Sequence, residues 1–106
     1  MKPANYGPTY ACIYPGLAEV TRAHGYALAV HGSMARDFDL VCIPWAEKVS
    51  HPDDVVNAIT TKFSIHQIGE PGQKNHGRVA YTISLGFGEC FIDLSFMPLV
   101  PLTGND

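Results

Sequence analysis

The chain has 106 residues, of which 46% are apolar and 16% are charged, and its formal net charge at pH 7 is −3. This length and composition predict a single folded domain with one core, and they exclude an intrinsically disordered chain. The excess of acidic over basic side chains argues against a protein dedicated to long DNA or RNA, because such binding depends on Lys and Arg.

The three cysteines, Cys12, Cys42 and Cys90, are far apart and include no C-x-x-C pair. This spacing is typical of thiols in a reducing compartment rather than of a disulfide framework. The first ten residues contain no apolar stretch, and no run approaches the roughly 18 apolar residues of a membrane-spanning helix. We therefore expect a cytoplasmic protein that makes no membrane contact.

The first half of the chain is predicted to contain an arm, a helix and two strands. Residues 1–14 combine Pro and Gly with tyrosines, which predicts an irregular arm. A helix is expected over 17–24, opened by Pro15 and Gly16, because proline is favoured at a helix start. Short apolar runs predict buried strands over 26–30 and 38–43.

The second half is predicted to contain a helix and three strands. The helix, capped by Ser50 or Asp53, runs to about Phe63, because apolar residues recur there at helical spacing. The remaining predicted segments are a strand over 64–68, a polar loop over 69–77, two strands with hairpin spacing over 79–85 and 90–96, and an irregular tail over 97–106. The order predicts the α/β (α+β) class, with a mixed β-sheet of about five strands and two to three helices packed on one side.

Two acidic residues stand at the start of the second predicted strand. Asp37 and Asp39 point to the same face, because successive side chains of a strand alternate. At an effective dielectric constant of about 20, two carboxylates ~5 Å apart repel by about 3 kcal/mol, which full solvation or a bridging cation relieves. Carboxylate oxygens suit Mg²⁺, or alternatively Mn²⁺, better than zinc.

A third carboxylate, Asp93, lies inside the last apolar strand, where Asp is uncommon. If this strand neighbours the strand of Asp37 and Asp39, the three carboxylates converge and could hold two divalent ions for a phosphoryl displacement. Asp93 could then also accept the proton of the attacking hydroxyl. The alternative is that Asp93 forms an ion pair with Arg78 or Arg36 at a sheet edge.

Gly32 and Ser33 come directly after the first predicted strand. A glycine at such a turn lets the backbone approach a ligand, and the exposed N–H groups attract phosphate oxygens. The hydroxyl of Ser33 adds a further donor. His31, next to this turn, is the histidine that we expect to line a site.

Gly32-Ser33, then Asp37-x-Asp39 on a strand and Asp93 on a later strand, resemble the DNA polymerase beta-like nucleotidyltransferase superfamily in its minimal single-domain form. The resemblance covers most of the chain. It implies a nucleotidyltransferase-like fold in which Gly32 and Ser33 hold a nucleoside triphosphate. It also implies that Asp37 and Asp39 bind two magnesium ions, and that Asp93 completes the catalytic and metal-binding set.

The chain departs from that family in the connection between the two motifs. Only Met34, Ala35 and Arg36 separate Gly-Ser from Asp-x-Asp, where the family usually has a helix of several residues. We therefore expect the helix N-terminus that faces the phosphates to be short or missing. Arg36 could replace its dipole with a full charge, and is a third predicted nucleotide-binding residue. Lys74, His76 and Arg78 could close over a triphosphate, or belong to a solvated hairpin loop.

The leading hypothesis is a Mg²⁺-dependent nucleotidyltransferase that moves a nucleoside monophosphate from a triphosphate to a hydroxyl of a small molecule or a protein. The alternative is a degenerate module of the same fold that binds a nucleotide or a protein partner without turnover. A metal-dependent phosphodiesterase using the same acids on water is a third hypothesis. A second subunit could complete the substrate cleft, so a homo-oligomer is also an expectation.

Overall fold

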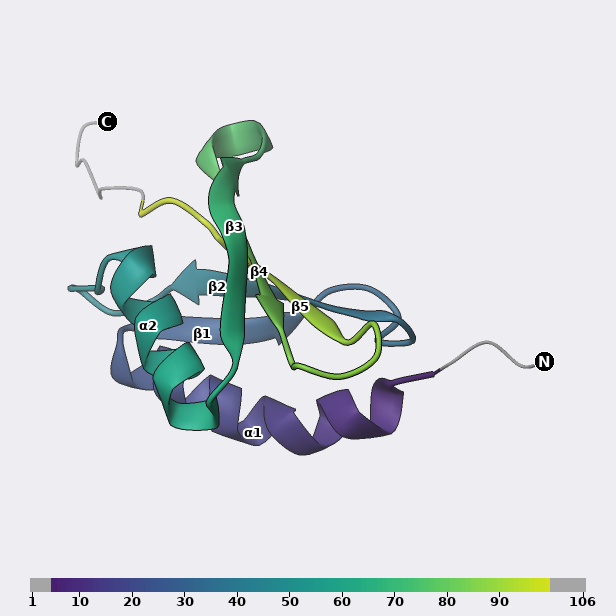
Figure 1. The fold of residues 1–106 in the computed structure, drawn as a ribbon. Coiled ribbons are helices and arrows are strands. Elements are labelled where there is room, and N and C mark those ends of the chain that lie inside the picture. The colour runs from purple at the N-terminus through teal and green to yellow at the C-terminus, as the bar shows by residue number, and fades with distance from the viewer. Residues whose placement is uncertain (1–4, 100–106) are drawn as a thin grey trace.

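The computed structural model describes residues 5–99, which form an α+β arrangement of two α-helices and a five-stranded mixed sheet (Figure 1). In chain order the elements are α1 (Gly7–Ala23), β1 (Tyr26–Val30), β2 (Asp37–Pro44), α2 (Pro52–Phe63), β3 (His66–Gln73), the 3-10 turn η1 (Asn75–Gly77), β4 (Val79–Ser84) and β5 (Phe91–Phe96). The strand order across the sheet is β1-β2-β5-β4-β3, with β2 and β5 parallel and the other neighbours antiparallel. The predicted order of helices and strands is confirmed.

The predicted arm over 1–14 is wrong from residue 7 onward, where helix α1 already begins. Pro8 lies in the first turn of α1, so proline does mark the helix start, but a different proline from the expected one. Pro15 lies inside the helix, where it removes one backbone hydrogen bond. The burial of Tyr10 and Leu17 on the sheet stabilises the helix across this gap. Residues 1–4 lie outside the described part.

The predicted polar loop over 69–77 is also wrong in its first half. Strand β3 continues through it to Gln73 and pairs with β4, with a bulge between Ile68 and Gly72. Pro71 is tolerated because β3 is an edge strand, where a missing N–H costs no ladder bond. Nearly all side chains of β3 are exposed, so no apolar alternation marks this strand in the sequence.

Helix α2 has the predicted extent but a different cap. The ring Nδ1 of His51, rather than a side chain of Ser50 or Asp53, accepts the bond from the Asp53 N–H, at 3.0 Å. Asp53 and Asp54 occupy the first turn, where negative charge is favourable for the helix dipole. Of the predicted tail over 97–106, residues 97–99 have no regular secondary structure, and 100–106 lie outside the described part.

The two faces of the sheet differ because both helices pack on one of them (Figure 1). The alternate residues of β2 and β5 that meet the helices form the core with both helices. They are Phe38, Leu40, Cys42, Ile92, Leu94 and Phe96. The other face, which we call the open face, carries Asp37, Asp39 and Asp93. The predicted alternation of both strands is confirmed.

The outer edge of the sheet at β1 is partly occupied by a side chain of α1. The His31 N–H bonds to the Asp39 carbonyl, so alternate residues of β1, among them Leu28, direct their backbone groups away from β2. The hydroxyl of Tyr14 donates a hydrogen bond to the outward carbonyl of Leu28. This hydrogen bond therefore occupies one of the few outward backbone groups of β1 with which another strand could pair.

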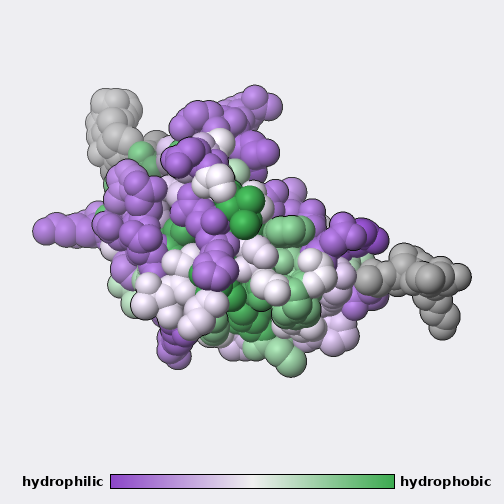
Figure 2. Space-filling view, viewed as in Figure 1, coloured by the Kyte–Doolittle hydropathy of each residue, from purple (hydrophilic) through white to green (hydrophobic). Residues whose placement is uncertain are grey.

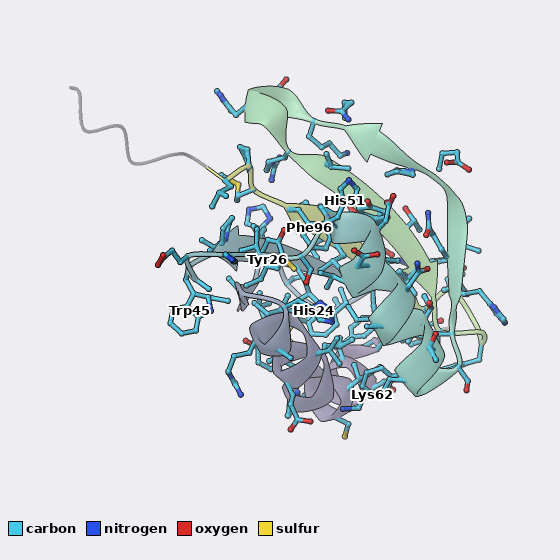
Figure 3. All side chains as sticks on the ribbon, turned by 90° about the vertical axis from the view of Figure 1, so that its left-hand side faces the viewer. His24, Tyr26, Trp45, His51, Lys62 and Phe96 are labelled. Atoms are coloured by element: carbon cyan, nitrogen blue, oxygen red, sulfur yellow. The ribbon has the colours of Figure 1, made fainter. Side chains whose placement is uncertain are left out.

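Two regions project away from the core, the β3–β4 hairpin and the end of β2. Figure 2 shows hydrophilic residues over the projecting β3–β4 hairpin. In Figure 3, Trp45 points away from the core and is 65% exposed, whereas Tyr26 and Phe96 face each other with ring centroids 5.2 Å apart. Neither helix within residues 5–99 combines the length and apolarity needed to cross a membrane.

Candidate active site

The structure brings two of the three predicted carboxylates together. Strands β2 and β5 are parallel neighbours, and their register places Asp39 directly opposite Asp93 on the open face. Asp37 lies one step back along the same face, opposite Phe91, and its side chain is exposed. The convergence of acids that are 54 positions apart in the sequence thus follows from strand pairing.

The environment of Asp39 disfavours its negative charge. Partial burial raises the pKa of Asp39, the charges of Asp93 and Asp37 raise it further, and His31 offsets part of this effect. Two carboxylates that face each other on a half-buried surface repel, and a bound cation is one kind of ligand that would relieve this repulsion.

Gly32 brings the turn after β1 against this acid. Its φ of +101° is a conformation that side-chain-bearing residues rarely adopt, and a Cβ there would lie 3.0 Å from Oδ2 of Asp39. The backbone therefore passes directly beside the Asp39 carboxylate. Only a glycine permits this approach without strain.

The other two predicted nucleotide-binding residues have partners within the protein. Oγ of Ser33 accepts a hydrogen bond from the Ala35 N–H at 3.3 Å. The guanidinium of Arg36 lies 3.8 Å from the carboxylate of Glu89, and both side chains are more than half exposed. Residues 31–36 contain no helix, as expected from the short spacing between the motifs.

A hollow of about 250 Å³ opens beside the paired acids. The polar side chains that line it come from the end of β1, from β2, from β5 and from the β3–β4 hairpin. These are His31, Asp39, Lys74, Arg78, Asp93 and Ser95. His31 was expected to line a site, and it does. Arg36, Gly32 and Ser33 lie outside this lining.

Among the described residues Asp93 forms no ion pair with an arginine, which was the alternative prediction. Within residues 5–99, the ion pairs join Arg36 to Glu89, His51 to Asp53 and Lys62 to Glu19. Arg78 lines the same hollow as Asp93 but is not within 4.0 Å of its carboxylate. Asp93 therefore faces Asp39 without a compensating cation from this part of the chain.

The carboxylate oxygens of this site are the kind of donor that Mg²⁺ prefers, but the protein provides few of them. In the part of the chain that the structure describes, no three His, Cys, Asp or Glu side chains form a group that could hold a metal ion on their own. Mg²⁺ commonly uses one or two carboxylates and completes its shell with water and substrate phosphates. Asp39 and Asp93 provide such a pair, with Asp37 beside it.

Two residues of the hollow, Lys74 and Arg78, were not assigned to the site from the sequence. The available signal was the group of basic residues in a glycine-containing stretch, which also fits a solvated loop. The path of β3 brings both residues beside the hollow, because its extended pairing with β4 carries them to the open face. Periodicity could not reveal this in an edge strand with exposed side chains.

The chain was also compared with known proteins. No protein-family model matches it, and neither does a curated protein or a solved structure.

Proposed function

We propose that the protein is a Mg²⁺-dependent nucleotidyltransferase that moves a nucleoside monophosphate from a triphosphate to a hydroxyl of a small molecule or a protein. The observation that carries this proposal is the pairing of Asp39 with Asp93 across parallel strands, on an uncovered face, next to a turn that needs glycine. The resemblance of Gly32-Ser33 and Asp37-x-Asp39 to a nucleotidyltransferase motif supports the same reading.

In this proposal the three acids share the binding of metal, and Asp93 has a second task. Asp39 and Asp93 would hold one magnesium ion, and Asp37 beside them would hold a second. Mg²⁺, when bound, supplies positive charge that screens the phosphates and favours in-line displacement. Asp93 accepts the proton of the acceptor hydroxyl. The acceptor oxygen forms a bond to the α-phosphorus while the bond from that phosphorus to the bridging oxygen breaks, releasing pyrophosphate.

The test is pyrophosphate release from each of the common nucleoside triphosphates in Mg²⁺, compared among matched variants. We expect Asp39→Asn and Asp93→Asn to lower the rate at least about 100-fold, because each removes a carboxylate that acts on the reacting groups. Glu47→Gln, which neutralises an exposed acid outside the hollow, should leave the rate unchanged. Equal rates in all three variants would refute the assignment.

A binding module without turnover is the second candidate, and one observation favours it. Residues 31–36 contain no helix, so no helix N-terminus faces the phosphates there. For such a module we expect Mg²⁺-dependent triphosphate binding that Asp39→Asn removes, with no pyrophosphate formed. Equilibrium dialysis with labelled triphosphate, beside the pyrophosphate assay, separates the two functions.

A further inference from the structure

The β3–β4 hairpin carries two basic residues, Lys74 and Arg78, on either side of its closing turn. The Lys74 N–H donates a hydrogen bond of 2.7 Å to the Arg78 carbonyl, next to the pair of Gln73 and Val79. The short turn η1 closes the hairpin beyond them. Lys74 and Arg78 are therefore backbone neighbours across the hairpin, and both side chains line the hollow.

The hollow is charged with opposite signs on different parts of its wall. Asp39 and Asp93 contribute carboxylates, whereas Lys74 and Arg78 contribute an ammonium and a guanidinium. Within residues 5–99, none of the ion pairs includes any of these four residues. The opposite charges thus stand apart across the hollow instead of neutralising each other. A ligand that carries a cation at one end and a row of anionic groups at the other would satisfy both.

The strand register shows the order of the polar groups along the hollow. Asp93 and Asp39 form one row across the sheet, and Ser95, which also lines the hollow, follows two residues later on β5, about 6.5–7 Å along the strand. Val79 pairs with Phe96, so Arg78 stands at the far side of Ser95 from Asp93. The hollow therefore runs from the acids, past a hydroxyl, to the basic pair.

We infer that Lys74 and Arg78 bind the phosphate chain of the triphosphate, so that the chain crosses the open face from the metal toward the β3–β4 hairpin. This inference rests on the proposed function for the identity of the ligand. It assigns to the hairpin the role that a helix after the Gly-Ser turn would otherwise have. Ser33 and Arg36 do not line the hollow, and the guanidinium of Arg36 lies on the side of Glu89, 3.8 Å from its carboxylate.

The experiment measures binding of inorganic tripolyphosphate by titration calorimetry, first with EDTA and then with Mg²⁺. This probe has no base, sugar or reacting acceptor, so it tests the cations apart from catalysis. We expect Lys74→Gln and Arg78→Gln each to weaken binding about tenfold in both conditions, since each loses a charge-assisted contact to phosphate. Lys48→Gln, an exposed cation outside the hollow, should bind like the unaltered protein. Arg36→Gln, which removes the guanidinium nearest to the Gly-Ser turn, is measured beside them as the competing assignment.

The outcomes separate this inference from the proposed function. Weaker tripolyphosphate binding in the Lys74 and Arg78 variants alone supports the inference, even if no pyrophosphate is ever released. In that case only the proposed catalysis fails. Equal binding by all variants overturns the inference, as does a larger loss in Arg36→Gln or no tripolyphosphate binding by the unaltered protein. Pyrophosphate release with an unchanged KM in Lys74→Gln/Arg78→Gln would overturn it while leaving the catalytic proposal intact.

Discussion

At the scale of single residues, Asp39 carries the most direct prediction about pH. Its pKa is raised by burial and by the charges of Asp93 and Asp37, so the folded protein holds the Asp39 proton more tightly than the unfolded chain does. The free energy of unfolding therefore falls as pH rises from the ordinary aspartate pKa, about 3.9, through the raised value, and stays lower above it. The ionised Asp39 carboxylate therefore lowers the free energy of unfolding at neutral pH, and this loss disappears in acid, where the carboxylate is protonated.

Asp39→Asn tests this reasoning by thermal unfolding between pH 3 and pH 8 without Mg²⁺. At neutral pH we expect the variant to melt a few degrees higher, because relief of about 1 kcal/mol shifts the Tm of a domain of this size by roughly 4–8 °C. The difference should shrink as pH falls through the raised pKa of Asp39 and vanish below the ordinary aspartate pKa. A variant that is less stable at pH 7 would show that the Asp39 carboxylate has a stabilising partner. Glu47→Gln, which neutralises an exposed acid outside the hollow, is the control.

At the scale of elements, the first turns of α1 position the connection that precedes β2. The Tyr6 N–H donates to the Ala35 carbonyl at 2.8 Å, and the hydroxyl of the fully buried Tyr10 donates to the Arg36 carbonyl. The Tyr10 ring also stacks on Phe38, with ring centroids 4.7 Å apart. The helix that replaces the expected arm thus holds the loop leading to Asp37 and Asp39.

Tyr10→Phe should keep the ring stacking and lose only the hydroxyl. We expect a cost of about 1–2 kcal/mol in the free energy of unfolding, because the Arg36 carbonyl loses its donor. Amide hydrogen exchange of residues 33–36 should become faster. Tyr14→Phe is the matched control, since its hydroxyl bonds to the carbonyl of Leu28 in edge strand β1, and exchange at 33–36 should not change there. Equal exchange at 33–36 in both variants would contradict the positioning role.

The elements differ in how well the sequence predicts them, for physical reasons. Strands β1, β2, β4 and β5 are half or fully buried, so apolar runs and alternation mark them. The first half of α1 and the second half of β3 are the segments predicted wrongly. In both, tertiary packing or backbone pairing outweighs a local signal from Pro and Gly, as with Pro15 inside α1 and Pro71 on the edge of the sheet.

In the whole molecule, one face of the sheet makes the core with both helices, and neither helix covers the other face. Ile92→Ala, at a position 1% exposed under the helices, should cost about 2–5 kcal/mol in chemical denaturation. Ile43→Ala, at a position 43% exposed on the open face, should cost less than about 1 kcal/mol. Similar losses in both variants would mean that the open face is covered by something that contributes to stability.

The candidate site was predictable in its residue types but not in its geometry. Alternation places Asp37 and Asp39 on one face, and the strand prediction places Asp93 on another strand. That β5 lies beside β2 in parallel, with Asp93 opposite Asp39, depends on the long-range topology, which local patterns do not specify. The contribution of Lys74 and Arg78 depends in turn on the pairing of β3 with β4.

The bond from Tyr14 to the outward carbonyl of Leu28 has a consequence for self-association. A sheet edge with free backbone groups is a template on which another chain can add as a strand. A neighbouring molecule that extended the sheet at β1 would first have to displace this hydroxyl and compete for a carbonyl that is already satisfied. Strand addition at β1 is therefore less favourable than at an edge whose outward carbonyls are all free.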